Sequence, residues 1–176
     1  MQNTAPTLTT DRLIITPMTM EHWEAHAAAW ADPRMTEFIG GKPRTRTESW
    51  GKFLAASALW QHMGYGYWTF LDRATGEFVG NGGLSWFERG IAGLEGVPEA
   101  GWAFVPAAWG KGFATEAISA VLAWADAELN APEIRCIIDE GNAASMRVAE
   151  KLGFHFLQTT EESIGVVSLY ARKRGG

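Results

Sequence analysis

The segment Trp109-Gly110-Lys111-Gly112-Phe113-Ala114-Thr115-Glu116 decides how this chain is interpreted. It follows a run predicted as a strand, Glu99 to Val105, and it opens a long amphipathic helix from Lys111 to Leu129. Its two glycines and its alanine leave the backbone uncovered where the helix begins. The free N–H groups of a first helical turn, with their partial positive charge, form a site for phosphate oxygens. We therefore expect this segment to bind a phosphorylated cofactor.

Hydrophobic periodicity and turn residues predict the remaining elements. The predicted strands are Arg12–Thr16, Tyr65–Leu71, Glu77–Leu84, Glu99–Val105, Ile134–Ile138, His155–Thr159 and Ile164–Arg172. The predicted helices run from a cap at Thr19 to Asp32-Pro33, from Thr47 to His62, from Lys111 to Leu129 and from Ala143 to Leu152. The order β-α-α-β-β-β-α-β-α-β-β indicates an α/β (α+β) fold with a mixed sheet. We expect a single domain over residues 1–176, with residues 1–10 flexible.

The composition excludes several classes of protein. The formal charge is −5 and the basic residues are scattered, so no nucleic-acid-binding surface is expected. No apolar run reaches membrane-spanning length, and the N-terminus lacks the layout of a signal peptide. The single cysteine, Cys136, excludes an internal disulfide and fits a reducing cytosol, where it would pack in an apolar strand. We expect a cytoplasmic protein, in which some of the nine tryptophans line a pocket or a homodimer interface.

Several interpretations of the glycine segment compete. A P-loop requires Gly-x-x-x-x-Gly-Lys-Ser/Thr, which this chain does not contain. A dinucleotide fingerprint requires Gly-x-Gly-x-x-Gly, but Thr115 stands where its third glycine belongs. That fingerprint also belongs to an early strand–helix turn, whereas this segment lies beyond residue 100. An ordinary helix start without a ligand is a further interpretation. The last one is an acyl-coenzyme A site, which a second motif supports.

Both motifs resemble those of the GNAT acetyltransferases. The family signature Gln/Arg-x-x-Gly-x-Gly/Ala resembles residues 109–114, with Trp109 as the one departure. The run Asn142-Ala-Ala-Ser145-Met-Arg-Val-Ala-Glu-Lys-Leu-Gly-Phe154 resembles the family's Asn-x-x-Ser block and its Lys-Leu-Gly-Phe ending. With Thr10-Asp11-Arg12-Leu13, the motifs are most similar to the branch around the ribosomal-protein acetyltransferases RimJ and RimL. The resemblance covers residues 10–172.

The resemblance implies a mostly antiparallel GNAT sheet in which two parallel strands splay apart around acetyl-coenzyme A (acetyl-CoA). The cofactor pyrophosphate would accept hydrogen bonds from the glycine segment, where any side chain on Gly112 would cover the phosphate. The pantetheine arm would lie between the splayed strands as an added strand does. The residues implied to hold the cofactor are Phe104, Val105, Trp109, Gly110, Lys111, Gly112, Phe113, Ala114, Thr115, Asn142 and Ser145. No metal is expected, because the four histidines show no ligand spacing.

The implied reaction is direct attack of an amine on the thioester. Because an alkylamine has a pKa of roughly 10, a proton acceptor assists the attack, and a nearby hydroxyl can protonate the thiolate that leaves. The resemblance gives the hydroxyl role to Ser145, although Asn-x-x-Ser is also ordinary helix-capping chemistry. Glu99 is the candidate base, with a solvated strand-end carboxylate as the alternative interpretation. Other carboxylates that stay open as the base are Asp139, Glu140, Glu161 and Glu162.

The resemblance places the acceptor against the first two helices and the late strands. An apolar floor is expected from the aromatic side chains of Trp23, Trp30, Phe38 and Trp86. Carboxylates expected to attract a cationic amine are Glu88, Glu95, Glu99 and Glu161. The sequence thus predicts an N-acetyltransferase that uses acetyl-CoA in a ternary complex, with a protein N-terminal amine or a small-molecule amine as acceptor. A CoA-binding module without catalysis is the alternative.

Overall fold

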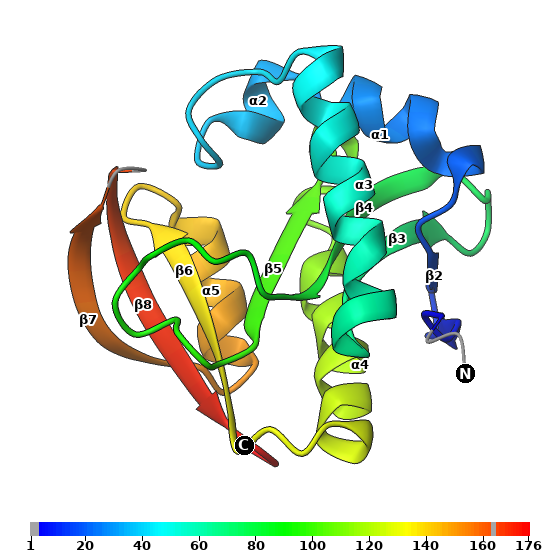
Figure 1. Ribbon diagram of the computed structural model, residues 1–176. Helices are drawn as coiled ribbons and strands as arrows, with labels where there is room; N and C mark the ends of the chain where they lie inside the picture. Colours follow the sequence, from blue (N-terminus) through cyan, green and yellow to red (C-terminus); the bar gives the residue numbers. More distant parts are fainter. Residues whose placement is uncertain (1–3, 163–164) are drawn as a thin grey trace.

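The computed structural model describes residues 4–162 and 165–176, and one mixed sheet forms its centre (Figure 1). The strands are β1 (Leu8–Thr9), β2 (Leu13–Pro17), β3 (Tyr67–Asp72), β4 (Phe78–Ser85), β5 (Glu99–Phe104), β6 (Glu133–Asp139), β7 (His155–Glu162) and β8 (Gly165–Lys173). Their order is β1-β2-β3-β4-β5-β6-β8-β7, and among these described strands β5 and β6 form the parallel pair. The predicted fold class is confirmed. Ile164, predicted to open the last strand, lies outside the described residues.

Helices cover both faces of this sheet. They are α1 (Trp23–Trp30), α2 (Pro33–Thr36), α3 (Arg46–Met63), α4 (Phe113–Glu128) and α5 (Ala143–Lys151). Successive residues of β3 face opposite sides: Tyr67 packs against the α1–α3 cluster, whereas Trp68 and Phe70 join the core that α4 and α5 cover. No helix in the described part of the chain is both long and apolar enough to cross a membrane.

The helix ends follow local chemistry. Thr45 and Glu48 form a reciprocal capping box that starts α3, and the left-handed Gly64 ends it. The helix α4 begins at Phe113, two residues later than the sequence predicts. Gly112, with a φ of 79°, is its N-cap and has left-handed rather than helical backbone angles.

Two predictions about irregular segments need correction. Residues 4–10 are not a flexible lead, because β1 pairs with β2 and the buried Trp68 indole donates to the Pro6 carbonyl at 2.7 Å. The first helix does end before Asp32-Pro33, but the same pair begins the short helix α2. Asp32 caps that helix, and Pro33 occupies the first position, where a missing N–H is tolerated.

The two halves of the sheet meet at one point. Glu99 is in register with Arg135, and the Arg135 N–H donates to the Pro98 carbonyl at 3.0 Å. Beyond that pair β5 continues to pair with β4, while β6 pairs with β8, and Figure 1 shows β5 and β6 diverging. The splayed parallel strands expected from the resemblance are therefore present.

A cluster of indoles consolidates one half of the sheet. Trp68 is fully buried and meets Trp60 and Trp124 edge-to-face, with ring centroids 4.5 Å and 5.3 Å away. Such contacts add stabilisation to the large apolar area that each indole buries. These three tryptophans therefore serve packing.

We predict that Trp68→Ala lowers the free energy of unfolding by about 3–5 kcal/mol, because it leaves a large cavity and removes the donor to Pro6. Urea unfolding followed by far-UV circular dichroism measures this loss. Trp50→Ala is the control, because Trp50 is partly exposed and should cost about 1 kcal/mol or less. Equal losses in the two variants would contradict the assignment of the core.

Candidate functional site

A cavity of about 420 Å³ lies where β5 and β6 separate. The sheet contributes Ala100–Ala103 from β5 and Ile137–Asp139 from β6, and the start of α5 contributes Asn142 and Ser145. The opposite wall comes from the first three helices and their loops, among them His26, Trp30, Phe38, Arg44, Lys52 and Ala56. The splayed strands and the expected acceptor helices therefore border one space.

The glycine segment presents backbone N–H groups at the start of α4. Gly110 and Gly112 have φ values of 71° and 79°, a conformation that favours glycine. Among the described residues no side chain caps this helix, so its first-turn N–H groups are not taken up by a cap. The sequence explains the small size of Gly112 by a ligand alone. The structure adds a backbone reason, which is the left-handed φ of Gly112. Space is not the reason, because a Cβ there would meet Arg12 Nη2 at an ordinary 3.5 Å.

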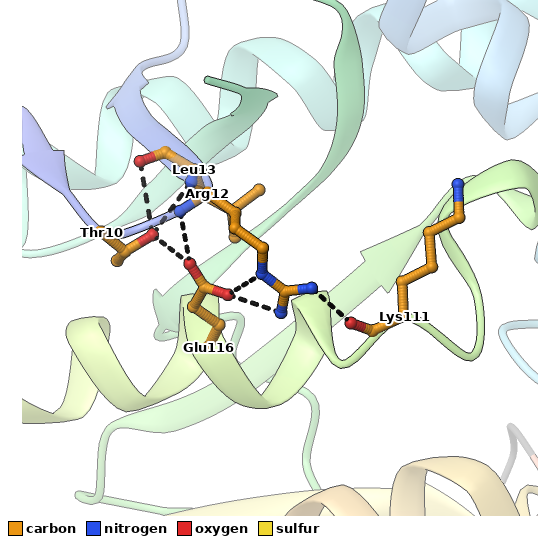
Figure 2. Close-up of polar contacts among 5 residues, drawn as sticks. All are labelled: Thr10, Arg12, Leu13, Lys111 and Glu116. Carbon is orange, nitrogen blue, oxygen red and sulfur yellow. Dashed lines mark hydrogen bonds and ion pairs between the residues drawn. The ribbon is translucent and has the colours of Figure 1, made fainter. Parts of the chain in front are cut away.

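Glu116 ties this helix start to the N-terminal strand (Figure 2). Its Oε1 accepts from the Thr10 hydroxyl at 2.6 Å and from the Arg12 N–H at 2.9 Å. Its Oε2 accepts from Arg12 Nε at 2.7 Å, while Arg12 Nη1 donates to the Lys111 carbonyl at 2.8 Å. Burial disfavours the charged carboxylate, but the bonds from Thr10 and Arg12 outweigh burial and lower the pKa of Glu116. Two motifs almost 100 residues apart thus form one structural unit.

The backbone of Val105, directly after β5, does not face β6 as the sequence predicts. The Val105 N–H donates to the Val79 carbonyl and the Val105 carbonyl accepts from the Ala108 N–H, both at 2.9 Å. Both backbone groups of Val105 therefore have partners within the chain, so its N–H, which bonds to β4, does not face the space between β5 and β6.

The backbone groups of Trp102 and Phe104 lie on the side of β5 that faces away from β4. Backbone groups alternate sides along a strand, so those of Trp102 and Phe104 point toward β6, past the point where the pairing stops. Trp109, whose side chain is half exposed, donates its indole N–H to the Phe104 carbonyl at 2.7 Å. The one departure from the family signature therefore has a structural role, and it leaves the Phe104 N–H facing the opening.

Asn142 and Ser145 occupy the same cavity wall. The Asn142 side chain accepts from the Ser145 N–H at 3.1 Å and caps α5, as the sequence predicts. The cap brings the Ser145 side chain to the cavity, so capping and chemistry do not compete for the same atom.

Glu99 is buried and lines the cavity, which excludes the solvated strand-end interpretation. Its Oε2 accepts from Arg89 Nε at 2.8 Å. Nearby Tyr67 was not singled out in the sequence. Burial first, and then the charge of Glu99, raise the pKa of Tyr67 to about 12, so its hydroxyl stays protonated at neutral pH.

The other carboxylates considered as a base are placed less favourably. Asp139 lines the cavity, but its Oδ1 accepts from the Gly141 N–H at 2.8 Å. Glu140 and Glu161 are exposed, and neither is among the residues that line the cavity. The side chain of Glu162 lies outside the described part of the structure.

Two of the four residues predicted for the apolar floor line the cavity, whereas Trp23 packs between α1 and α3. Trp30 and Phe38 form part of its wall, and Trp30 donates its indole N–H to the Asn81 side chain at 3.1 Å. Trp86 needs correction, because it lines a neighbouring hollow of about 90 Å³ and donates to Glu88. Glu88 and Glu95 also border that hollow rather than the cavity, so they do not form the expected anionic wall.

Sequence reasoning missed the cations of the cavity. Arg44 lies in the loop before α3, with its guanidinium carbon 3.6 Å from the centre of the Trp30 ring. Lys42, Lys52 and Arg89 line the same space. Their positions in the sequence do not connect them, because Lys42 and Arg44 share one loop while Lys52 lies in α3 and Arg89 in a distant loop.

Cys136 and the metal-ligating residue types supply no other chemistry here. Burial and the charge of Glu99 raise the pKa of the Cys136 thiol, so it is a packed side chain, as predicted, and not a nucleophile. Over the described residues, no group of three histidine, cysteine or acidic side chains is placed to hold a metal ion.

Comparisons with known proteins agree with this geometry. The model of the acetyltransferase (GNAT) domain family matches residues 12–155. The Bacillus subtilis protein YkkB is 34% identical over 141 residues, covering 79% of this chain and 78% of its own. The crystal structure of an acetyltransferase from Agrobacterium tumefaciens is 30% identical, with a TM-score of 0.83 over 95% of this chain and 94% of that one. Spermidine N-acetyltransferase from Vibrio cholerae, solved with CoA and spermine, shares the fold at 15% identity, with a TM-score of 0.75 over 94% and 97% of the two chains.

We predict that Glu116→Gln lowers the free energy of unfolding by about 1–2 kcal/mol at neutral pH, because its bonds to Arg12 and Thr10 lose their charge. The folded-state pKa of Glu116 lies below 4.5, so its contribution is present above that pH and is lost as the pH falls. Urea unfolding at pH 7 and at pH 3.5 should therefore show a difference that shrinks with acid. Glu128→Gln, an exposed change on the same helix, is the control. A difference that is independent of pH would contradict this role of Glu116.

Proposed function

Because the chain belongs to the GNAT acetyltransferase family, we propose that it transfers an acetyl group from acetyl-CoA to a primary amine. We also infer that it lies in the RimJ/RimL-like branch. The coupling of Thr10 and Arg12 to Glu116 supports this, since it gives the opening motif of that branch a function in the cofactor loop. The acceptor is then a protein N-terminal amine or a small-molecule amine that reacts in a ternary complex.

One observation carries the proposal: the pairing of β5 with β6 ends at Glu99, and a cavity lies where the strands part. An extended arm fits such an opening because unpaired backbone edges can bond to it as an added strand. The Trp102 backbone and the Phe104 N–H face that opening. The acyl end of the arm would then reach the cavity beside Ser145.

The glycine loop fits the pyrophosphate of this cofactor. Its N–H groups lie at a helix start with left-handed Gly110 and Gly112 and no side-chain cap. Arg12 neutralises Glu116, so the carboxylate in the first turns of α4 does not repel phosphate. Lys111 adds a positive charge beside the loop.

When bound, acetyl-CoA supplies an activated acetyl thioester. The residues around the cavity would orient the amine, accept its proton and supply a proton to the leaving sulfur. Ser145 is our candidate to donate a proton to the sulfur that leaves, and Tyr67, whose hydroxyl stays protonated, is placed on the same cavity to assist. Glu99 is our candidate to accept the proton of the amine, directly or through water. Its ion pair with Arg89 holds the carboxylate in a fixed position.

Thiol release from acetyl-CoA in the presence of a panel of amines tests the function. We expect turnover with at least one amine and loss of CoA binding, by more than about tenfold, in Gly112→Asp, since an aspartate adds like charge at the phosphate site. Gly96→Asp is the matched control, because Gly96 has a similar φ of 75° with open space around it. CoA binding without transfer to any amine would instead indicate the non-catalytic module, and absence of CoA binding would refute both.

We predict that Ser145→Ala lowers kcat by about 10- to 100-fold with little change in CoA affinity, because a positioned proton donor contributes on that scale. Steady-state kinetics with calorimetric CoA titration separates the two effects. The Asn142 cap uses the backbone N–H of residue 145, so the variant keeps the helix start. An unchanged kcat would restrict Ser145 to a structural role.

A further inference from the structure

The acceptor side of the cavity holds cations that lack partners. The carboxylates on its wall are engaged: Glu99 with Arg89, Glu48 with the Thr45 N–H at 2.7 Å, and Asp139 with a turn N–H. In the described part of the chain, no hydrogen bond or ion pair is found for the charged groups of Lys42, Arg44 and Lys52. A backbone N–H is neutral and leaves the carboxylate charge in place, but with Arg89 this wall carries four cations against three carboxylates, so its net formal charge is positive.

Arg44 is the most constrained of these cations. Its backbone N–H donates to the Trp30 carbonyl at 2.9 Å, and its guanidinium stacks on the ring of the same Trp30. Trp30 is in turn fixed by its bond to Asn81. A guanidinium held by its face keeps its N–H edge free for a planar or tetrahedral oxyanion.

Arg44 also differs from Arg172, a buried arginine of this structure. Arg172 is buried and forms a two-bond pair with Asp126, at 3.0 Å and 2.7 Å. Burial lowers the pKa of Arg44 to about 10, so Arg44 is partly desolvated yet charged at neutral pH. A desolvated cation without a partner costs free energy that a bound anion would recover.

The charge of Glu48, on the same cavity wall, partly offsets that of Arg44, but in the described part of the chain the two side chains form no hydrogen bond or ion pair. Buried His26 lines the same cavity, and neither of its ring nitrogens has a partner in the described structure. Burial first, and then the charge of Arg44, lower the pKa of His26 to about 4, so His26 is neutral at pH 7. His26 therefore adds no charge of its own beside the Arg44 guanidinium, which lines the cavity.

We propose that Arg44 binds an anionic group of the acceptor, which is therefore a small amine that also carries a carboxylate or a phosphate. This inference rests on the proposed acetyltransferase function. A volume of about 420 Å³ suits a small molecule, and Trp30, Phe38 and Phe87 offer apolar surface between the anionic end and the amine end. A polycationic amine, in contrast, would meet like charge at this wall.

Matched pairs of amines test the inference. Each α-amino acid is compared with the amine that lacks its carboxylate, such as phenylalanine with phenethylamine, and O-phosphoethanolamine is compared with ethanolamine. We expect the anionic member to have a kcat/KM at least about tenfold higher, since a charge-assisted hydrogen bond is worth that factor or more. The two kinds of pair distinguish carboxylate from phosphate. Equal or higher activity with the members that lack the anionic group would overturn the inference while leaving the acetyltransferase function intact.

A binding measurement keeps the inference independent of turnover. The same compounds are titrated calorimetrically into the CoA-loaded protein. We expect the anionic members to bind at least about tenfold more tightly, and this preference to fall to about twofold or less in Arg44→Gln and to survive in part in Arg44→Lys. Arg46→Gln is the matched control, because Arg46 lies two residues away, pairs with Glu24 and is not among the cavity residues.

Each outcome separates the two proposals. Preferential binding of anionic amines without thiol release for any amine would support the anion site and refute the acetyltransferase function. Thiol release with no preference between pair members, or an Arg44→Gln variant that keeps the preference, would refute the anion site alone. Circular dichroism of the variants confirms that they are folded.

Discussion

The register between Glu99 and Arg135 is the constraint on which the rest of this structure depends. It joins the two halves of the sheet at a single pair, after which β5 stays with β4 and β6 stays with β8. If β5 and β6 had stayed paired beyond Glu99, the backbone groups of Trp102 and Phe104 would be hydrogen-bonded to β6, and no cavity would form between the strands. The same separation gives Glu99, at the joint, a buried position at the edge of the cavity.

The second constraint connects the N-terminal strands to the glycine loop at the start of α4. Glu116 accepts hydrogen bonds from Thr10 and Arg12, and Arg12 also donates to the Lys111 carbonyl, so direct hydrogen bonds join the first strands to the glycine loop. An acidic residue in the first turns of a helix would weaken an anion site. Pairing it with an arginine removes that penalty and fixes the loop, which is consistent with the proposed role in phosphate binding.

The sequence predicts the framework well and the site in part. Periodicity locates most strands and helices, because each buries one face, and capping residues such as Asn142 and Gly64 set helix ends within a residue or two. Local signals do not reveal long-range pairing. The engagement of Val105 by Val79, the order around Pro6 and the displacement of Trp86 all depend on which strands become neighbours. The stacking of Arg44 on Trp30 depends on tertiary contact in the same way.

A crystal structure of the chain with CoA tests the central claim most directly. The account predicts the pyrophosphate at hydrogen-bond distance, about 2.7–3.2 Å, from the backbone N–H groups of residues 110–115, with the pantetheine between β5 and β6 and its sulfur beside Ser145. A pyrophosphate bound away from this loop, or a pantetheine that does not enter the space between the two strands, would contradict it.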